Sequence, residues 1–404
     1  MPGRIVVTGI GAVTPIGSGC EPFWHALLGG RCGIGPVSSF DTRDYNVHQG
    51  AEVKNFDAND YVSRLNAASL GRASQFAIAA ARLALDDSGV DLSTMDPARA
   101  GVTIGTTSGE PGIIERFDDA AEGRDLDAIG PEFIRLYPCH VIAAHVASEL
   151  ELAGPNITIP TACAAGNYAI AYAFDALRSG RADLMLAGGS DSFSRITYTG
   201  FARLGAIAPR TCQPFDRNRK GMVPGEGSGI LVVESAERAL DRGARIYAEV
   251  TGYGLTCDAH HMTAANPEGA ARAMEKALCE AHVDPEDVSY ISAHGTGTPT
   301  NDRLETQAVK RVFGPSAYRV PISSIKSMLG HTMGAASALE AAVCALAIFH
   351  GRIPPTINLE DPDPECDLDY VPNQAREHRV EIAMNNAYAF GGNNASLILR
   401  RAYV

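Results

Sequence analysis

Short runs of β-branched and apolar residues alternate along the chain with alanine-rich stretches that are long enough for helices. This alternation is typical of parallel strands joined by helices, because parallel neighbours need a long crossover between them. In the first part of the chain we expect strands at residues 4–8, 100–105, 156–159, 184–187 and 229–234. The expected helices cover residues 69–88, 138–150, 164–179 and 236–242.

A second series of the same kind begins at Arg245. Its expected strands are 245–253, 289–293, 320–323, 382–388 and 395–400, and its expected helices are 269–281, 302–313 and 335–350. The order of elements roughly repeats that of the first series, which indicates an internal duplication. We therefore expect two halves, residues 1–244 and 245–404, with two sheets packed around shared helices.

Two of the expected helices, one in each half, have almost no charged face. A helix without a polar stripe must be enclosed on most sides, and this applies to residues 164–177 and 334–348. The apolar run 334–349 contains Glu340 and is shorter than the roughly 20 residues that a bilayer helix needs, so we interpret it as a buried helix. These two helices predict a site between the halves.

Composition excludes several classes of protein. The 404 residues include 34 Lys and Arg against 47 Asp and Glu, a formal charge of −13, so nucleic acid is not an expected partner. The nine cysteines lack the spacing of a structural zinc site or a disulfide framework, which indicates a reducing compartment. The first residues lack the features of a secretory signal, and we expect a cytoplasmic protein without membrane insertion.

One cysteine stands apart by its position. Cys163 lies where an expected strand ends and the first enclosed helix begins. A thiol at a helix N-terminus feels the positive end of the helix dipole, which favours the thiolate and makes the sulfur a nucleophile. The alternative interpretation is a small buried core residue, which is what most free cysteines are.

Three further residues lie near the carboxyl ends of expected strands. His294 follows a strand in the run His294-Gly-Thr-Gly-Thr, and Lys326 and His331 lie between a strand and the second enclosed helix. Open α/β sheets place their ligands at this edge, so these side chains and Cys163 are candidates for one site. The run Gly9-Ile-Gly-Ala-Val-Thr is not interpreted as a dinucleotide loop, because Thr14 replaces the third glycine and no acidic residue follows a second strand.

With these motifs the sequence resembles the β-ketoacyl-acyl carrier protein synthases, the elongating condensing enzymes of the thiolase superfamily. The resemblance covers essentially the whole chain, from Val6-Val-Thr-Gly-Ile-Gly to Phe390-Gly-Gly-Asn-Asn. Its most specific parts are Thr161-Ala-Cys-Ala-Ala-Gly, Pro214-Phe-Asp with Gly225-Glu-Gly-Ser-Gly, His294-Gly-Thr-Gly-Thr and Lys326-Ser-Met-Leu-Gly-His. The Cys-His-His arrangement is similar to this branch, whereas the initiating synthases use Cys-His-Asn.

The resemblance implies an α/β, thiolase-like fold with duplicated α-β-α-β-α layers, in which two mixed five-stranded sheets enclose central helices. It implies an acyltransferase with no cofactor or metal of its own, because its substrates travel on the phosphopantetheine of an acyl carrier protein. Cys163, in the N-terminal half, would take the acyl chain as a thioester. Malonyl carrier protein would then lose carbon dioxide, and its carbanion would attack the thioester to give a 3-oxoacyl carrier protein.

The resemblance also implies roles for residues of the C-terminal half. His294 and His331 would donate N–H bonds to the enolate oxygen, and Lys326 would set the local field and orient His331. Glu340 would hold the lysine or a water. The backbone N–H groups of Cys163 and Phe390 would form a second oxyanion hole for the acyl thioester.

Two more features of the resemblance concern the substrate. Thr296 and Thr298 match threonines that bind the phosphopantetheine arm, although hydroxyls at a strand end also cap turns. Phe390, followed by two glycines, matches the aromatic gate of the acyl pocket.

The chain departs from the family pattern in three places. Segment 64–72 corresponds to a docking helix for acidic carrier proteins, but family positions that are often basic are Ala68 and Ser69 here. The stretch 189–214 is shorter than in housekeeping synthases, and loop 106–110 is more polar than their gating loop. These departures favour a specialised synthase for a polyene or aromatic polyketide.

Other functions remain as alternatives. A non-catalytic chain-length subunit would share the fold but lack the nucleophile that Cys163 supplies. A coenzyme A thiolase needs a second catalytic cysteine near the C-terminus, where Cys366 lies in an acidic loop and matches poorly. Fatty acid and polyketide elongation both stay open. We expect a homodimer, or a heterodimer with a similar ketosynthase-like subunit, with strand 156–159 near the two-fold axis.

Overall fold

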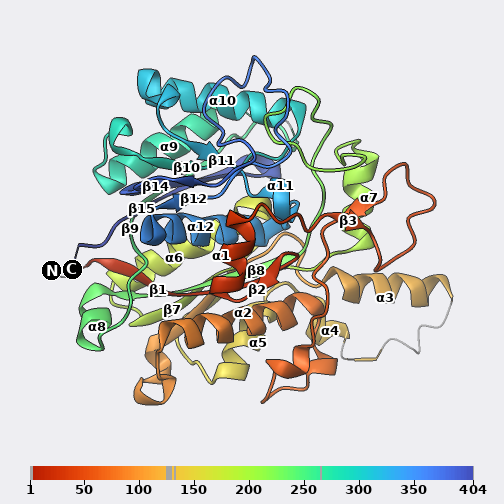
Figure 1. Ribbon diagram of the computed structural model, residues 1–404. Helices are drawn as coiled ribbons and strands as arrows, with labels where there is room; N and C mark the ends of the chain where they lie inside the picture. The colour runs from red at the N-terminus through yellow and green to blue at the C-terminus, as the bar shows by residue number, and fades with distance from the viewer. Residues whose placement is uncertain (1–2, 124–129, 132, 264–265, 404) are drawn as a thin grey trace.

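The computed structural model describes residues 3–123, 130–131, 133–263 and 266–403, which form alternating layers of helices and sheets (Figure 1). Helices α2 (Arg72–Ser88) and α5 (Val141–Leu150) cover one outer face. Helices α9 (Pro267–Ala281) and α10 (Pro299–Phe313) cover the other. Helices α6 (Ala165–Arg178) and α12 (Ala336–His350) lie in the central layer between the sheets.

Each half of the described chain contributes five main strands in the same spatial order. The first five are β6 (Asn156–Ile159), β5 (Ala100–Gly105), β7 (Leu184–Asp191), β8 (Gly227–Ser235) and β1 (Ile5–Thr14), named from the outer edge inward. The second five are β11 (Ile322–Ser323), β10 (Tyr290–Ser292), β14 (Ile382–Tyr388), β15 (Asn393–Arg400) and β9 (Ala248–Cys257).

The strand directions repeat as well. In each half the outer three strands pair in parallel, and the fourth and fifth strands pair antiparallel. A shared order and a shared set of directions confirm the internal duplication that the sequence predicts.

The two five-stranded portions are joined at their inner edges. Strand β1 pairs antiparallel with β9, from Ile5 opposite Val250 to Val7 opposite Ala248. The expected pair of sheets is therefore one continuous sheet with a short seam, because the first strand of each half has a free edge facing the other.

Strand β1 is longer than expected because its glycines pack against a helix. A Cβ atom at Gly11 would lie 1.8 Å from the carbonyl oxygen of Ala80 in α2, so only glycine allows this approach. The Gly9–Gly11 run lies inside a buried strand, as expected from the missing third glycine of a dinucleotide loop.

The two central helices also approach closely. A Cβ atom at Gly166 of α6 would lie 2.5 Å from the backbone nitrogen of Ala338 in α12. Residues 333–350 are long and apolar enough to pass as a membrane span by composition, yet 89% of this segment is buried inside the protein. The predicted buried helix is confirmed.

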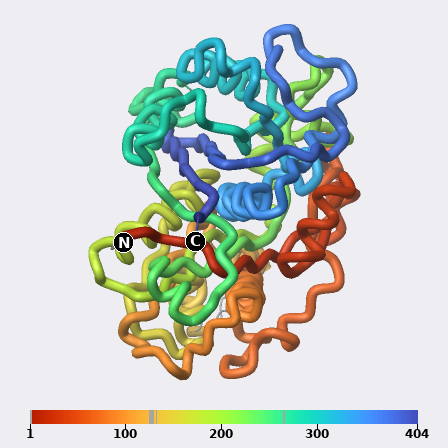
Figure 2. Tube along the Cα trace, turned by 60° about the vertical axis from the view of Figure 1, so that its left-hand side comes forward, coloured from red at the N-terminus to blue at the C-terminus, as the bar shows by residue number. Residues whose placement is uncertain are grey.

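The remaining described elements cover the edges of these layers. The other helices are α1 (Cys20–Leu28), α3 (Pro111–Glu122), α4 (Phe133–Leu136), α7 (Arg195–Arg203), α8 (Ala236–Asp241) and α11 (Lys326–Leu329). Two-residue strands are β2 (Gly17–Ser18), β3 (Gly35–Pro36), β4 (Gln49–Gly50), β12 (Arg352–Ile353) and β13 (Arg376–Glu377). The two ends of the described chain lie on the same side of the molecule (Figure 1), and the turned view shows them apart from each other (Figure 2).

Candidate active site

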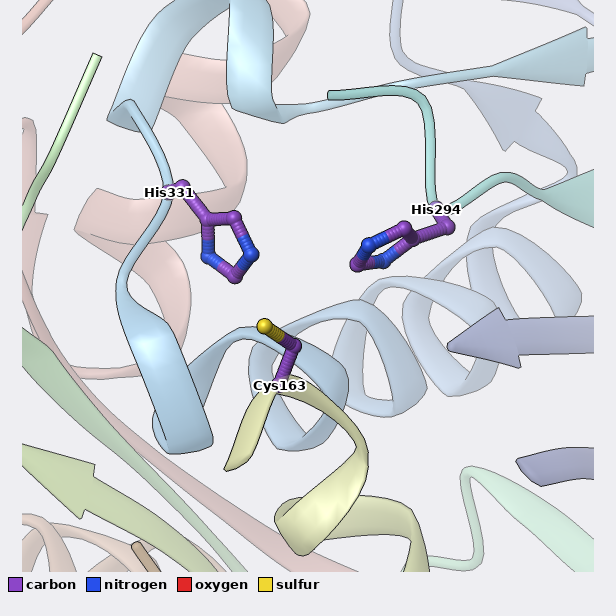
Figure 3. Close-up of side chains that lie close together, drawn as sticks. All are labelled: Cys163, His294 and His331. Carbon is purple, nitrogen blue, oxygen red and sulfur yellow. The ribbon is translucent and has the colours of Figure 1, made fainter. Parts of the chain in front are cut away.

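Cys163 lies in a 3₁₀ turn, Ala162–Ala164, that connects β6 to the enclosed helix α6. The turn begins with Ala162 at φ 51°, a left-handed conformation that costs a residue with a Cβ atom about 1–2 kcal/mol. The Cys163 side chain is 8% exposed and points toward both candidate histidines (Figure 3). A strained turn at the start of a helix therefore sets the position of this thiol.

His294 follows β10 and is held through its backbone. The carboxylate of Glu305, in α10, accepts hydrogen bonds from the backbone N–H groups of His294 and Gly295, both at 2.8 Å. The imidazole itself is buried, and its Nδ1 atom has no hydrogen-bond partner among the described residues.

His331 lies in the turn between α11 and α12. Its Nδ1 atom accepts a hydrogen bond from the Met333 backbone N–H at 3.1 Å. An imidazole that accepts at Nδ1 in its neutral form carries its proton on Nε2, so Nε2 is the donor.

The structure brings Cys163, His294 and His331 together from three separate segments (Figure 3). One Sγ or ring nitrogen atom from each residue lies within 4.8 Å of the other two. The centres of the two imidazole rings are 5.5 Å apart, with their planes at 83°. This spacing leaves the thiol facing two hydrogen-bonding rings.

Both imidazoles are neutral at physiological pH. Burial, together with the positive charge of Lys326, holds the pKa of His331 well below its usual range. The same two causes, with a smaller contribution from His331, lower the pKa of His294. Two neutral N–H donors suit a site in which negative charge develops on an oxygen.

The thiol differs from the sequence-based expectation. Burial raises the pKa of Cys163 to about 11, against the opposing effects of Lys326 and the backbone N–H. The expected thiolate is therefore wrong for the free protein, because desolvation of this buried thiol outweighs the helix N-terminus. The nucleophile has to lose its proton during the reaction.

Lys326 forms a buried ion pair with Glu340. The lysine begins α11, the glutamate lies on α12, and their charged atoms are in direct contact. Burial raises the pKa of Glu340 to about 7, although the lysine acts in the opposite direction. The second oxygen, Oε2, has no partner in the described part of the chain. The pair fixes a positive charge close to both histidines.

A cysteine and two histidines at this spacing also match the ligands of a zinc ion. However, Nδ1 of His331 already accepts a backbone hydrogen bond, which makes Nε2 the protonated ring nitrogen. With this N–H on Nδ1, the neutral ring has to keep its proton on Nε2, so Nε2 cannot bind a cation while the hydrogen bond is kept. The arrangement fits acyl transfer better than metal binding.

A cleft leads from the surface to the thiol. Its lining includes Cys163, both histidines, Thr296, Thr298 and Phe390. The hydroxyl oxygens of the two threonines are 2.9 Å apart, and that of Thr298 also caps α10 by accepting the Asn301 N–H.

Phe390 is 39% exposed at the mouth of this cleft. Its ring lies 5.7 Å from that of Phe201, and Gly391 and Gly392 follow it at φ 83° and 77°. Sequence reasoning missed Phe201 and Tyr388 as lining residues. Tyr388 lies at the end of a buried strand, where an aromatic residue is typical of core packing.

Cys366 is buried in the hydrophobic core of the C-terminal half and does not line the cleft. The structure therefore does not bring a second thiol to Cys163 from this position.

The expected docking segment carries little free charge. Ala68 and Ser69 lie exposed in a short 3₁₀ turn. Arg64 pairs with Glu151, and Arg72 pairs with the buried Glu226. The groove beside this turn is lined instead by Arg116 and Arg135, which form no ion pair within the described residues.

Comparison with known proteins agrees with this geometry. Residues 3–239 match the model of the N-terminal domain of beta-ketoacyl synthase, and residues 247–360 match that of its C-terminal domain. A 3-oxoacyl-[acyl-carrier-protein] synthase 2 from Synechocystis sp. is 42% identical over 98% of both chains.

Two solved structures are similar over the full length of both chains. The ishigamide ketosynthase/chain length factor is 44% identical with a TM-score of 0.97. A type II polyketide ketosynthase, solved in complex with its acyl-carrier protein, is 35% identical with a TM-score of 0.91. The thiolase-like fold class expected from the sequence is confirmed, and this chain belongs to the β-ketoacyl synthase family.

Proposed function

We propose that this protein catalyses the decarboxylative condensation of an acyl chain, held as a thioester on Cys163, with malonyl-acyl carrier protein. The product is a 3-oxoacyl carrier protein, one step of fatty acid or polyketide elongation. The observation that carries the proposal is the thiol facing two neutral imidazoles, one of which has Nδ1 occupied and Nε2–H free to donate.

In the first half-reaction Cys163 attacks the acyl thioester of the donor carrier protein. The new bond joins Sγ to the acyl carbon, and the phosphopantetheine thiol leaves with the proton that the cysteine loses. The backbone N–H groups of Cys163 and Phe390 would stabilise the oxyanion that forms on the way. Thr296 and Thr298 would bind the phosphopantetheine arm within the cleft that they line.

In the second half-reaction the malonyl group loses its carboxylate as carbon dioxide, and the electron pair of the broken bond becomes an enolate. His294 and His331 would donate N–H bonds to the enolate oxygen. The carbon atom of the enolate then attacks the thioester on Cys163, and the new carbon–carbon bond releases the cysteine. The Lys326–Glu340 pair supports both histidines in the neutral state by its nearby positive charge.

Intact mass spectrometry tests the proposal. Incubation with an acyl carrier protein should add one acyl group to the wild type, and malonyl carrier protein should then remove it with release of carbon dioxide. Cys163→Ala should gain no acyl mass, whereas the exposed-thiol control Cys257→Ala should behave as the wild type. Acylation that persists in Cys163→Ala would contradict the proposal.

Service in polyketide elongation is a second, finer version of the same function. It is supported by the polar loop 106–110 and by the similarity to the ishigamide ketosynthase/chain length factor. A competition between saturated and polyenoyl thioesters for Cys163 distinguishes the versions. Preferred acylation by saturated chains would contradict the polyketide version.

We propose a cytoplasmic enzyme that works with an acidic acyl carrier protein and a second ketosynthase-like subunit, identical or similar to itself. Strand β6 lies at an edge of the described sheet with only β5 beside it, so a partner strand can pair there. Sedimentation that gives a stable monomer at micromolar concentration would contradict the dimer.

A further inference from the structure

Asp191 is a buried carboxylate that none of the steps above uses. It is the last residue of β7 and is 1% exposed. An isolated charge at such a depth is costly, so its surroundings have to compensate for it.

Four hydrogen bonds converge on this carboxylate. Oδ1 accepts the Thr106 hydroxyl at 2.7 Å and the Ser108 N–H at 3.2 Å. Oδ2 accepts the Thr107 N–H at 2.8 Å and the Gly334 N–H at 2.6 Å. Three donors belong to loop 106–109, which follows β5, and the fourth belongs to the 3₁₀ turn Met333–Ala335 before α12.

All four partners donate to the carboxylate, which favours its ionised state. The Thr106 hydroxyl donates to Asp191 and accepts the Gly109 N–H at 3.0 Å. The other three partners are backbone N–H groups, which can only donate and therefore favour the ionised carboxylate. Burial raises the pKa of Asp191 to about 6, so the group is ionised at neutral pH.

The fourth hydrogen bond leads directly to a candidate catalytic residue. Gly334 follows Met333, and the Met333 N–H is the donor that occupies Nδ1 of His331. Met333 has φ 52°, a conformation that surrounding contacts must hold in place. Asp191 supplies such a contact on the neighbouring peptide group.

The loop on the other side of Asp191 is connected to the nucleophile. The Thr106 N–H donates to the carbonyl oxygen of Ile159 at 3.2 Å, at the end of the strand that leads to Cys163. The fit is also tight at the turn, since a Cβ atom at Gly334 would lie 2.7 Å from Oδ2 of Asp191. One carboxylate therefore bridges the segments that carry Cys163 and His331.

We propose that Asp191 is a positioning residue for the condensation. It holds the turn Met333–Ala335 against loop 106–109, and thereby keeps the Met333 N–H on Nδ1 of His331 and the Nε2 proton directed at the enolate oxygen. The inference rests on the proposed function and adds to it a residue that touches neither substrate nor thiol. Its loss should impair decarboxylation more than acylation.

The test separates the two half-reactions in the full-length protein. Release of carbon dioxide from malonyl carrier protein is measured in a Cys163→Ala background, with and without Asp191→Asn. We expect kcat to fall about 10- to 100-fold with little change in KM, because a misplaced donor stabilises the transition state less. Acylation of Cys163 in the single variant Asp191→Asn should stay within about threefold of the wild type.

Glu110→Gln is the matched control. Glu110 is equally buried at the end of the same loop, but its carboxylate accepts the N–H groups of Ala73 and Ser74 at the start of α2. It has no hydrogen bond to the turn before α12 in the described structure, so both half-reactions should stay near the wild-type rates. Thr106→Val removes the hydrogen bonds of the hydroxyl to Asp191 and from the Gly109 N–H, but it keeps the carboxylate. It should give a smaller loss of decarboxylation and serves if Asp191→Asn does not fold.

The outcomes are distinct. Equal loss of acylation and decarboxylation in Asp191→Asn, or an equal loss in Glu110→Gln, would show a general structural role and overturn the inference. A folded Asp191→Asn or Thr106→Val protein with wild-type decarboxylation would overturn it as well. If the wild type itself neither acylates nor decarboxylates, the proposed function fails and this inference falls with it.

Discussion

The two halves contain the same strand-to-helix turn with different chemistry. In the N-terminal half, Ala162 at φ 51° begins the 3₁₀ turn that precedes α6. In the C-terminal half, Met333 at φ 52° begins the 3₁₀ turn that precedes α12. The next residue is Cys163 in the first turn and Gly334 in the second.

The difference shows how two copies of one backbone motif contribute different groups to one proposed reaction. The first turn directs the Cys163 side chain into the cleft. In the second turn the Gly334 N–H donates to Asp191, and the Met333 N–H donates to Nδ1 of His331. At the same distance along the following helix, the first copy has the buried Ala169 and the second has Glu340. The nucleophile and the charged machinery therefore lie on opposite copies of one motif.

The largest expected effect comes from breaking the ion pair that the second copy alone contains. Lys326→Met leaves Glu340 buried beside an apolar side chain, which should cost about 3–5 kcal/mol of unfolding free energy. The double variant Lys326→Met/Glu340→Gln should recover most of this loss, as measured by chemical denaturation. A single variant as stable as the wild type would show that the second copy does not depend on its buried charges.

Removal of His331 tests the difference between the two copies by its effect on activity. Pro160 stands in the first copy where His331 stands in the second. His331→Ala should lower decarboxylation about 10²–10³-fold, because one donor to the developing oxyanion is lost. Acylation of Cys163, followed by intact mass, should fall much less. A loss of acylation larger than the loss of decarboxylation would show that His331 acts mainly in the acylation of Cys163, and would contradict this division.

Asp191, which holds the second turn, should make the unfolding free energy of the protein depend on pH. Because burial raises its pKa from 3.8 to about 6, the folded protein binds this proton more tightly than the unfolded chain. Stability from this group is therefore greatest at acid pH and falls as pH rises from about 4 to 6, by about 3 kcal/mol in total.

Asp191→Asn removes this ionisation. The unfolding free energy of the variant minus that of the wild type should therefore increase between pH 4 and 7, as measured by denaturation at each pH. A difference that stays constant across this range would contradict the raised pKa.

An added methyl group tests the close packing at the second turn. In Gly334→Ala the Cβ atom would lie 2.6 Å from the Thr106 carbonyl carbon, so loop 106–109 would have to move. The expected cost is about 1–3 kcal/mol. Cys163→Ala is the equivalent change in the first turn and should alter thermal stability less, since it adds no atom. Equal effects would mean that both turns are packed alike.

The smallest expected effect concerns the strain that the two turns share. Ala162→Gly relieves a left-handed conformation but gives the unfolded chain more freedom, so stability should change by less than about 1 kcal/mol. Met333→Gly relieves the same strain but removes a side chain that is 2% exposed, and should destabilise the protein by thermal denaturation. Equal stability changes in the two variants would contradict a stabilising contribution from the buried Met333 side chain.

The fold was largely predictable because its elements are either fully buried or sharply bounded. Strand β14 and the core of α12 lie where the apolar pattern places them. Strand β1 extends beyond its expected end because glycines that suggest a loop are needed for contact with α2. Helix α3 was missed because it is mostly exposed and carries only a narrow apolar face.

The candidate site was predictable where residue type and position coincide, as for Cys163, His294 and His331. Their meeting in one site was also predicted, because all three follow expected strands at the same edge of the sheet. The spacing and the relative orientation of the two rings depend on the folded backbone. Asp191 gave no signal, because an aspartate that ends a strand is typical of a turn. The raised pKa of Cys163 depends on how completely the folded chain excludes water, which the sequence alone does not reveal.

The position of β1 at the seam has a consequence for folding during synthesis. This strand is made before its pairing partner β8, which begins at Gly227, about 200 residues later, and its partner β9 follows. At about 5–20 residues per second, an apolar strand that is paired only with the two-residue strand β2 waits for roughly ten seconds or more on the ribosome. Pairing over such sequence distances makes folding slow, so the growing chain depends on protection from aggregation until the second half begins.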